Sequence, residues 1–175
     1  MAFARGSTLR NTEYGLPNTN TKTGLKMSTY TLRQATEADC EFLYQLHKAA
    51  MQEYVAATWG WQEEWQREYF DKKWDPRQRQ VIQVNGRDAG VLVVENRQDE
   101  YYLGLIELLP EFQGKGVGTA VLADFLHTAQ LLGLPATLHV LKTNGRARQF
   151  YERLGFAIAA DEEIRYKMQR VTDSE

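Results

Sequence analysis

The part of this sequence best suited to binding an anion is the stretch Gln113-Gly114-Lys115-Gly116-Val117-Gly118. Its glycines let the backbone approach a bound phosphate closely, because no side chain intervenes. A helical apolar period follows at once, so the N–H groups of the first helical turn and the helix dipole would act on the same anion. The spacing disfavours a nucleoside-triphosphate loop and differs from the Gly-x-Gly-x-x-Gly dinucleotide pattern. The stretch predicts a phosphate cradle, with a plain tight turn as the alternative.

A second segment lies about thirty residues downstream, beginning at Asn144 and running through Tyr151 to Gly155-Phe156. Together the two segments resemble the GNAT superfamily of acetyl-CoA-dependent N-acetyltransferases. The loop of that family reads Arg/Gln-x-x-Gly-x-Gly/Ala, and its later signature is Asn, then Tyr, then Gly-Phe. The loop pattern is matched here by Gln113, Gly116 and Gly118. The resemblance covers residues 30–168, and two motifs at matching spacing are far more specific than one.

The resemblance implies that acetyl-CoA is the co-substrate. The loop at 114–119 would hold the pyrophosphate through backbone amides, and residues 106–108 would run beside the pantetheine arm like a pseudo-strand. In the family this strand and the strand at 137–141 splay apart and admit the thioester, and Asn144 would bond the pantetheine region. The residues expected to bind acetyl-CoA are Ile106, Leu108, Gln113, Gly114, Lys115, Gly116, Val117, Gly118, Thr119 and Asn144.

The same resemblance places Tyr151 near the CoA sulfur, where it would protonate the departing thiolate; the alternative is an aromatic residue of the core. A primary amine, with a pKa of about 10, is mostly protonated at neutral pH and needs a base before it can attack. Two candidates are Glu107, within an apolar run of the pantetheine strand, and His139, on the facing strand. Their structural alternatives are a solvent-facing Glu and a hydrogen-bonded His, and the choice between the two bases stays open.

The acceptor side would be built by the first two helices, as in the family. The chain between Glu53 and Glu68 carries four carboxylates and one arginine, and it includes Trp59 and Trp61. Aromatic faces and carboxylates together favour a cationic amine. We therefore predict that Glu53, Trp59 and Trp61 receive the acceptor. The alternative is that the aromatic residues are core and the carboxylates form a solvated helix face.

The helices and strands that position these residues are predicted from the spacing of the hydrophobic residues and from the capping residues, glycines and prolines that mark where an element begins or ends. The expected order is βααβββαβαββ, which is a mixed α+β class around a largely antiparallel sheet. The resemblance adds helices on both faces and a splay between the fourth and fifth strands. A capping box at Thr36 and Asp39 opens the first helix, and the second carries Trp65, Tyr69, Phe70 and Trp74 on one side. The expected strands are 30–34, 81–84, 90–95, 101–109, 137–141, 156–159 and 164–168. The expected helices are one that follows the capping box and stops at Gly60, one at about 61–73, a long one that the glycine stretch opens and Gly133 ends, and one at 146–154.

Composition excludes several other classes of protein. The 175 residues hold 21 Lys+Arg and 23 Asp+Glu, a net charge of −2, so no general basic footprint for nucleic acid exists. A single cysteine, Cys40, excludes an intrachain disulfide, and three widely spaced histidines disfavour a metal site. No apolar run approaches the roughly 18–20 residues that span a bilayer. A cytoplasmic protein without membrane, nucleic-acid or metal partners is the expectation.

We interpret residues 1–26 as a disordered leader or tag-like extension, residues 27–170 as a single GNAT domain and residues 171–175 as a short tail. The predicted function is transfer of an acetyl group from acetyl-CoA to a primary amine of a small molecule or peptide, by direct attack. The alternative is a non-catalytic acyl-CoA-binding module of the same fold. Because dimers are common in the family, a homodimer is a further expectation, and the acceptor itself stays open.

Overall fold

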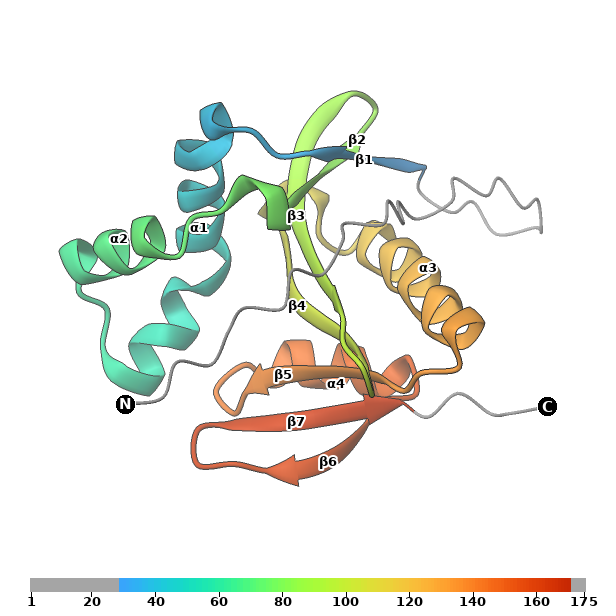
Figure 1. The fold of residues 1–175 in the computed structure, drawn as a ribbon. Coiled ribbons are helices and arrows are strands. Elements are labelled where there is room, and N and C mark those ends of the chain that lie inside the picture. Colours follow the sequence, from blue (N-terminus) through green and yellow to red (C-terminus); the bar gives the residue numbers. More distant parts are fainter. Residues whose placement is uncertain (1–28, 171–175) are drawn as a thin grey trace, which may run out of the picture.

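The computed structural model describes residues 29–170, in which the helices and strands follow the predicted order (Figure 1). The predicted leader at 1–26 and tail at 171–175 lie outside the described residues. The strands are β1 (Tyr30–Gln34), β2 (Gln80–Val84), β3 (Arg87–Asn96), β4 (Tyr101–Leu108), β5 (Ala136–Leu141), β6 (Ala157–Asp161) and β7 (Arg165–Arg170). The helices are α1 (Cys40–Trp59), α2 (Glu63–Lys72), α3 (Val117–Leu132) and α4 (Gly145–Arg153).

The strands form one seven-stranded sheet in the order β1-β2-β3-β4-β5-β7-β6. All neighbouring pairs are antiparallel except β4 and β5, which are parallel. The main core packs α3 and α4 on one face of the sheet, and a smaller cluster packs α1 on the other. In Figure 1, α1 and α2 accordingly lie on the opposite side of the sheet from α3. The predicted α+β class with helices on both faces is confirmed.

Local sequence signals explain where the elements begin and end. The Thr36–Asp39 capping box is present, with the Thr36 N–H donating to Asp39 Oδ2 at 2.7 Å, and α1 follows directly. Gly60 ends α1 with a φ of 83°, a backbone angle that residues other than glycine rarely adopt. Asn85 and Gly86 both have positive φ between β2 and β3, as a two-residue hairpin turn requires.

The parallel pairing of β4 and β5 is short, and the two strands separate beyond it. It joins only Tyr101–Leu103 to Ala136–Leu138. Beyond Leu103, β4 continues beside β3 alone, and β5 continues beside β7. The predicted splay between the fourth and fifth strands is therefore confirmed. It leaves the β5-facing edge of the second half of β4 without a strand partner.

The second helix differs from its prediction. It is shorter than the expected 61–73, and its aromatic residues do not share one environment. Phe70 and Trp74 pack against the smaller core cluster. Trp65 and Tyr69 are half exposed, at 54% and 50%, and stack on each other with ring centroids 5.1 Å apart. The prediction that all four share one side was wrong: Trp65 and Tyr69 lie four positions apart on one helix face, whereas Phe70 and Trp74 contact the core cluster.

Candidate active site

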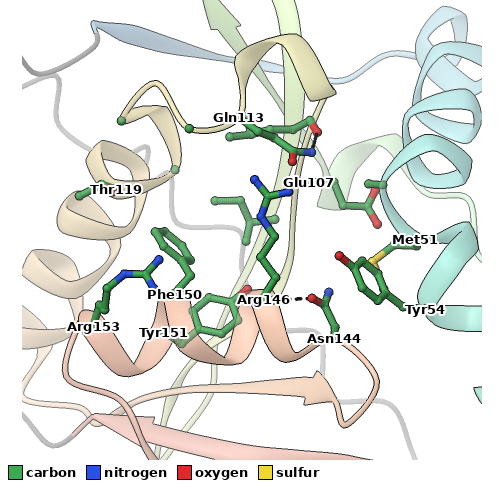
Figure 2. A pocket seen from close by; sticks show the side chains of 17 residues that line it. Met51, Tyr54, Glu107, Gln113, Thr119, Asn144, Arg146, Phe150, Tyr151 and Arg153 are labelled. Atoms are coloured by element: carbon green, nitrogen blue, oxygen red, sulfur yellow. Dashed lines mark hydrogen bonds between the residues drawn. The ribbon is translucent and has the colours of Figure 1, made fainter. Parts of the chain in front are cut away.

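A cavity of about 370 Å³ lies between α1, the second half of β4, the start of α3 and one face of α4 (Figure 2). The splay of β4 from β5 makes room for it. The two sequence motifs, which are far apart in the chain, meet on its walls. The predicted residues that line the cavity are Ile106, Glu107, Leu108, Gln113, Gly114, Gly116, Gly118, Thr119, Asn144 and Tyr151.

The glycine loop has the backbone geometry of an anion cradle. Gly114 and Gly116 both have φ in the left-handed region, at 70° and 82°. Gly116 is the N-cap of α3, and no side chain caps this helix end. The first N–H groups of α3 therefore lack a capping partner and can bind a negative group. A Cβ on Gly114 would meet nothing within 4 Å, so glycine is required there by conformation rather than by crowding.

Other loop residues have structural tasks that the sequence did not reveal. The Gln113 side chain donates from Nε2 to the Leu108 carbonyl at 2.8 Å, which ties the loop to the end of β4. The Val117 side chain is 1% exposed and belongs to the main core, so only its backbone can face a ligand. Lys115, also predicted to bind the cofactor, is not among the residues that line the cavity.

The fourth helix supplies another part of the cavity wall. Asn144 is its N-cap, and Oδ1 accepts the Ala147 N–H at 3.0 Å, so the amide NH₂ is its remaining donor. Sequence analysis missed Arg146, Phe150 and Arg153, which also line the cavity. Their spacing could have revealed them in the sequence, because residues separated by four and then three positions lie on one face of a helix.

Tyr151 is buried at 9% exposure and packs its ring edge-on against Phe156, at 5.9 Å between centroids. Burial raises the pKa of its phenol well above the ordinary value, and the negative charge of Glu107 raises it further. The hydroxyl is therefore fully protonated at neutral pH. A protonated phenol on a cavity wall can act as a proton donor.

Glu107 is 3% exposed and pairs with a residue that sequence analysis missed. Its Oε1 lies 2.8 Å from Nδ1 of His47 on α1. Although burial disfavours the charged imidazole, the hydrogen bond and the charge of Glu107 together raise the pKa of His47. The sequence could have pointed to His47, because it lies next to the core-facing residues Leu43 and Leu46 of α1, and a histidine on a buried helix face needs a polar partner.

The other candidate base, His139, lies elsewhere. Its Nδ1 is 3.1 Å from the Tyr102 hydroxyl and its Nε2 is 3.2 Å from Glu162. It does not line the cavity. Of the two bases that the sequence proposed, only Glu107 is brought together with Tyr151 and the glycine loop.

The three predicted acceptor residues are also not among the residues that line the cavity. On this side, the cavity is lined by Ala50, Met51 and Tyr54 of α1. Glu53 is exposed, and Trp59 is 58% exposed. Trp61 lies closer to the Glu107–His47 pair, since its ring centroid is 6.5 Å from that of His47. Its indole N–H donates to Glu63 at 2.8 Å.

Two other kinds of site are not found in the described part of the chain. Within residues 29–170, no group of three or more His, Cys, Asp or Glu side chains could hold a metal ion. No helix in the same range combines the length and apolarity needed to cross a bilayer.

Residues 40–156 match the acetyltransferase (GNAT) family. An uncharacterized N-acetyltransferase of Methanocaldococcus jannaschii is 28% identical over 142 residues, which are 74% of this chain and 62% of that protein. The uncharacterized N-acetyltransferase CgeE of Bacillus subtilis is 31% identical over 68 residues, 39% of this chain and 26% of that protein. The chain thus spans less than two thirds of the length of these relatives.

Solved structures share the fold. The PaiA N-acetyltransferase of Thermoplasma acidophilum, in complex with coenzyme A, aligns with a TM-score of 0.68 at 16% identity, covering 82% of this chain and 99% of that one. The ribosomal-protein-S18-alanine N-acetyltransferase of Escherichia coli aligns with a TM-score of 0.61 at 21% identity, covering 84% and 96%. The chain belongs to the GNAT acetyltransferase family.

Proposed function

We propose that this protein transfers an acetyl group from acetyl-CoA to the primary amine of a small molecule or peptide. One observation carries the proposal. A single cavity is lined by the uncapped start of α3, the unpaired edge of β4, a buried carboxylate and a protonated phenol. A phosphate cradle and an acid–base pair at one cavity suit a phosphate-bearing acyl donor whose acyl group reacts nearby. The family match supports acetyl as that group.

The residues present fit coenzyme A. The glycine loop and the first N–H groups of α3 would bind its pyrophosphate, and Arg146 and Arg153 add positive charge to the same cavity. The free edge of β4 at Ile106 and Leu108 would hydrogen-bond the amides of the pantetheine arm, and the Asn144 amide would add a donor. The complex of the PaiA enzyme with coenzyme A supports the assignment of this ligand to the fold.

The proposed reaction needs two proton transfers from the amine nitrogen. Glu107, directly or through a water molecule, takes one proton from the ammonium, and the free amine attacks the thioester carbonyl. As the C–N bond forms and the C–S bond breaks, Tyr151 donates its proton to the thiolate and regains one from the nitrogen. A backbone N–H on β4 would stabilise the negative oxygen of the intermediate. The products are an amide, CoA thiol and one released proton.

The proposed acceptor is a cation that enters from the α1 side, past Met51 and Tyr54 and towards Trp61. Met51 and Tyr54 line the cavity on this side (Figure 2). We keep Glu53 and Trp59 only as proposed outer contacts, because both are exposed. The neighbour named for an alanine of ribosomal protein S18 supports testing peptide N-termini beside small amines.

The test is release of CoA thiol from acetyl-CoA across a panel of polyamines, amino sugars and peptides with free N-termini or lysines. At least one amine should support turnover, and Glu107→Gln should lower kcat about 10²- to 10⁴-fold as expected for loss of a base. Calorimetry should show acetyl-CoA binding unchanged in that variant. Tight acetyl-CoA binding without turnover for any amine would instead identify the non-catalytic acyl-CoA-binding module.

A further inference from the structure

The two oxygens of the Glu107 carboxylate have different surroundings. The side chain is 1% exposed, and Oε1 contacts His47 Nδ1 at 2.8 Å. Oε2 is buried and has no hydrogen-bond partner among residues 29–170. Glu107 lines the cavity, and Figure 2 shows its carboxylate directed towards the side chains of Met51 and Tyr54. A buried carboxylate oxygen without a partner is costly, so this atom is suited to receiving a proton.

His47 connects this buried carboxylate to solvent. Its side chain is 26% exposed, in contrast to the 1% of Glu107. The imidazole lies among rings, with centroids 6.5 Å from Trp61 and 6.1 Å from Phe70. A proton held by Glu107 therefore has a titratable neighbour that reaches water, whereas the carboxylate itself is enclosed.

The charges around the imidazole favour a coupled pair. Glu107 on β4 attracts a proton to His47, and Arg79, which precedes β2, opposes it. The Arg79 guanidinium itself lies over the Phe70 and Trp74 rings. On α1, the neighbouring Lys48 is paired with Glu63 at 2.8 Å. The attraction of Glu107 prevails, so the pKa of His47 is raised and the imidazole is charged through a wider pH range than an ordinary histidine.

We propose that His47 is a positioning residue that forms one acid–base unit with Glu107 and returns the acceptor's proton to water. This inference rests on the proposed function. In each cycle an N–H bond of the acceptor ammonium breaks and an O–H bond forms at Glu107. The proton is then shared within the pair, and an N–H bond of His47 breaks towards water. The pair accepts a proton only after His47 has lost its own, so turnover should rise as the pH passes the raised pKa of His47.

The first test needs no acceptor. The His47 ring of the whole protein is titrated by NMR from pH 5 to 9, in the wild type and in Glu107→Gln. The wild-type midpoint should lie above the ordinary histidine pKa of about 6.5. It should fall below that value in the variant, where burial and Arg79 remain and the attracting charge is gone. The same midpoint in both proteins would show that the two groups are not coupled and would overturn the inference.

The second test separates positioning from mere packing. His47→Asn keeps an N–H donor near the place of Nδ1 but cannot titrate, and His47→Ala removes the donor. With saturating acetyl-CoA and the best amine of the panel, His47→Asn should lose the ascending limb of kcat/KM. It should also lower kcat, though less than His47→Ala does, because Asn still holds the carboxylate but cannot pass its proton to water. His47→Ala should lower kcat about 10- to 100-fold at every pH, because the carboxylate is no longer held. His127→Asn, on the exposed surface of α3, is the matched control and should keep the wild-type profile.

The outcomes distinguish the two proposals. A wild-type pH profile in His47→Asn, with Glu107→Gln strongly impaired, would contradict the role of His47 and leave the proposed function standing. Full activity of Glu107→Gln would remove Glu107 as the base and the inference with it. Absence of turnover with every amine would overturn the proposed function, and the ring titration would still report whether the two groups are coupled.

Discussion

Tyr151 combines a packing role in the core with the proton-donor role that we propose for it. Its ring contributes to the main core beside Phe156, and its hydroxyl belongs to a cavity wall near Glu107. Burial and the neighbouring carboxylate both raise the pKa of the phenol, so the hydroxyl carries its proton at neutral pH. In our proposal it passes this proton to the departing thiolate while it takes another from the amine nitrogen, so no free phenolate accumulates.

We therefore expect Tyr151→Phe to lower kcat about 10- to 1000-fold with little change in acetyl-CoA affinity, since only a proton donor is lost. Steady-state kinetics and calorimetry check the two halves of this expectation. Tyr69→Phe, which removes the same hydroxyl from an exposed ring on α2, is the control and should behave like the wild type. Unchanged turnover in Tyr151→Phe would mean that the thiolate leaves without this donor.

At the residue scale, the sequence predicted which residues lie together where a motif fixes their spacing, and it missed those that a long-range contact brings together; the roles of these residues stay predictions. The glycine loop, Asn144 and Tyr151 carry fixed spacings, and the structure brings them to one cavity. His47 has no motif, and its importance depends on meeting Glu107 sixty positions away. His139 looked equivalent to Glu107 in sequence, but its side chain meets Tyr102 and Glu162 instead.

At the scale of elements, the site depends on the start of α3 and the divergence of β4 from β5. The sequence predicted the order of elements because caps and turns are local signals, such as Thr36 before α1 and Asn85-Gly86 between β2 and β3. The splay was predicted only through the family resemblance, since no local sequence signal shows where the pairing of two parallel strands stops. The environment of the α2 aromatics was missed, because Trp65 and Tyr69 share one helix face whereas Phe70 and Trp74 contact the core cluster.

The cradle at the start of α3 gives an element-scale prediction. Gly116→Val should abolish acetyl-CoA binding in a protein that stays folded, because a β-branched residue disfavours the left-handed conformation at φ of 82° and disturbs the cradle. Lys115→Ala should be much milder, since backbone groups supply most of the contact. Calorimetric titration measures both, and a larger loss in Lys115→Ala would contradict the cradle.

A matched control is available at the other end of the same helix. Gly133 is the C-cap of α3, with φ of 66°, so Gly133→Val imposes a comparable backbone strain away from the cavity. It should lower the melting temperature while acetyl-CoA binding persists. Loss of binding in both variants would trace the effect to the stability of α3 rather than to the cradle.

The whole molecule combines a near-neutral charge with a local excess of carboxylates. Its net charge is −2, yet the stretch from Glu53 to Glu68 holds four carboxylates and one arginine. Part of this charge is already paired, since Glu63 contacts Lys48 and accepts from Trp61. The cytoplasmic location and the homodimer expected from sequence stay predictions.

We expect the acceptor panel to favour cations, because ring faces and carboxylates on the α1–α2 side attract an ammonium by about 0.5–2 kcal/mol per good contact. Values of kcat/KM should be higher for polyamines, amino sugars or basic peptides than for acidic peptides of the same length. Trp61→Ala should reduce this preference, and Trp65→Ala, half exposed on α2, serves as its control. A preference for acidic acceptors would contradict the assignment of this side to the acceptor.

The most direct measurement follows the acetyl group itself. The whole protein is incubated with acetyl-CoA that carries a deuterated acetyl group and with the amine panel, and products are analysed by mass spectrometry alongside thiol release. Our account predicts that the labelled acetyl group appears on an amine nitrogen in one-to-one ratio with free CoA, and that Glu107→Gln and Tyr151→Phe slow both signals together. Acetyl-CoA bound at the cavity with no label on any amine would contradict it.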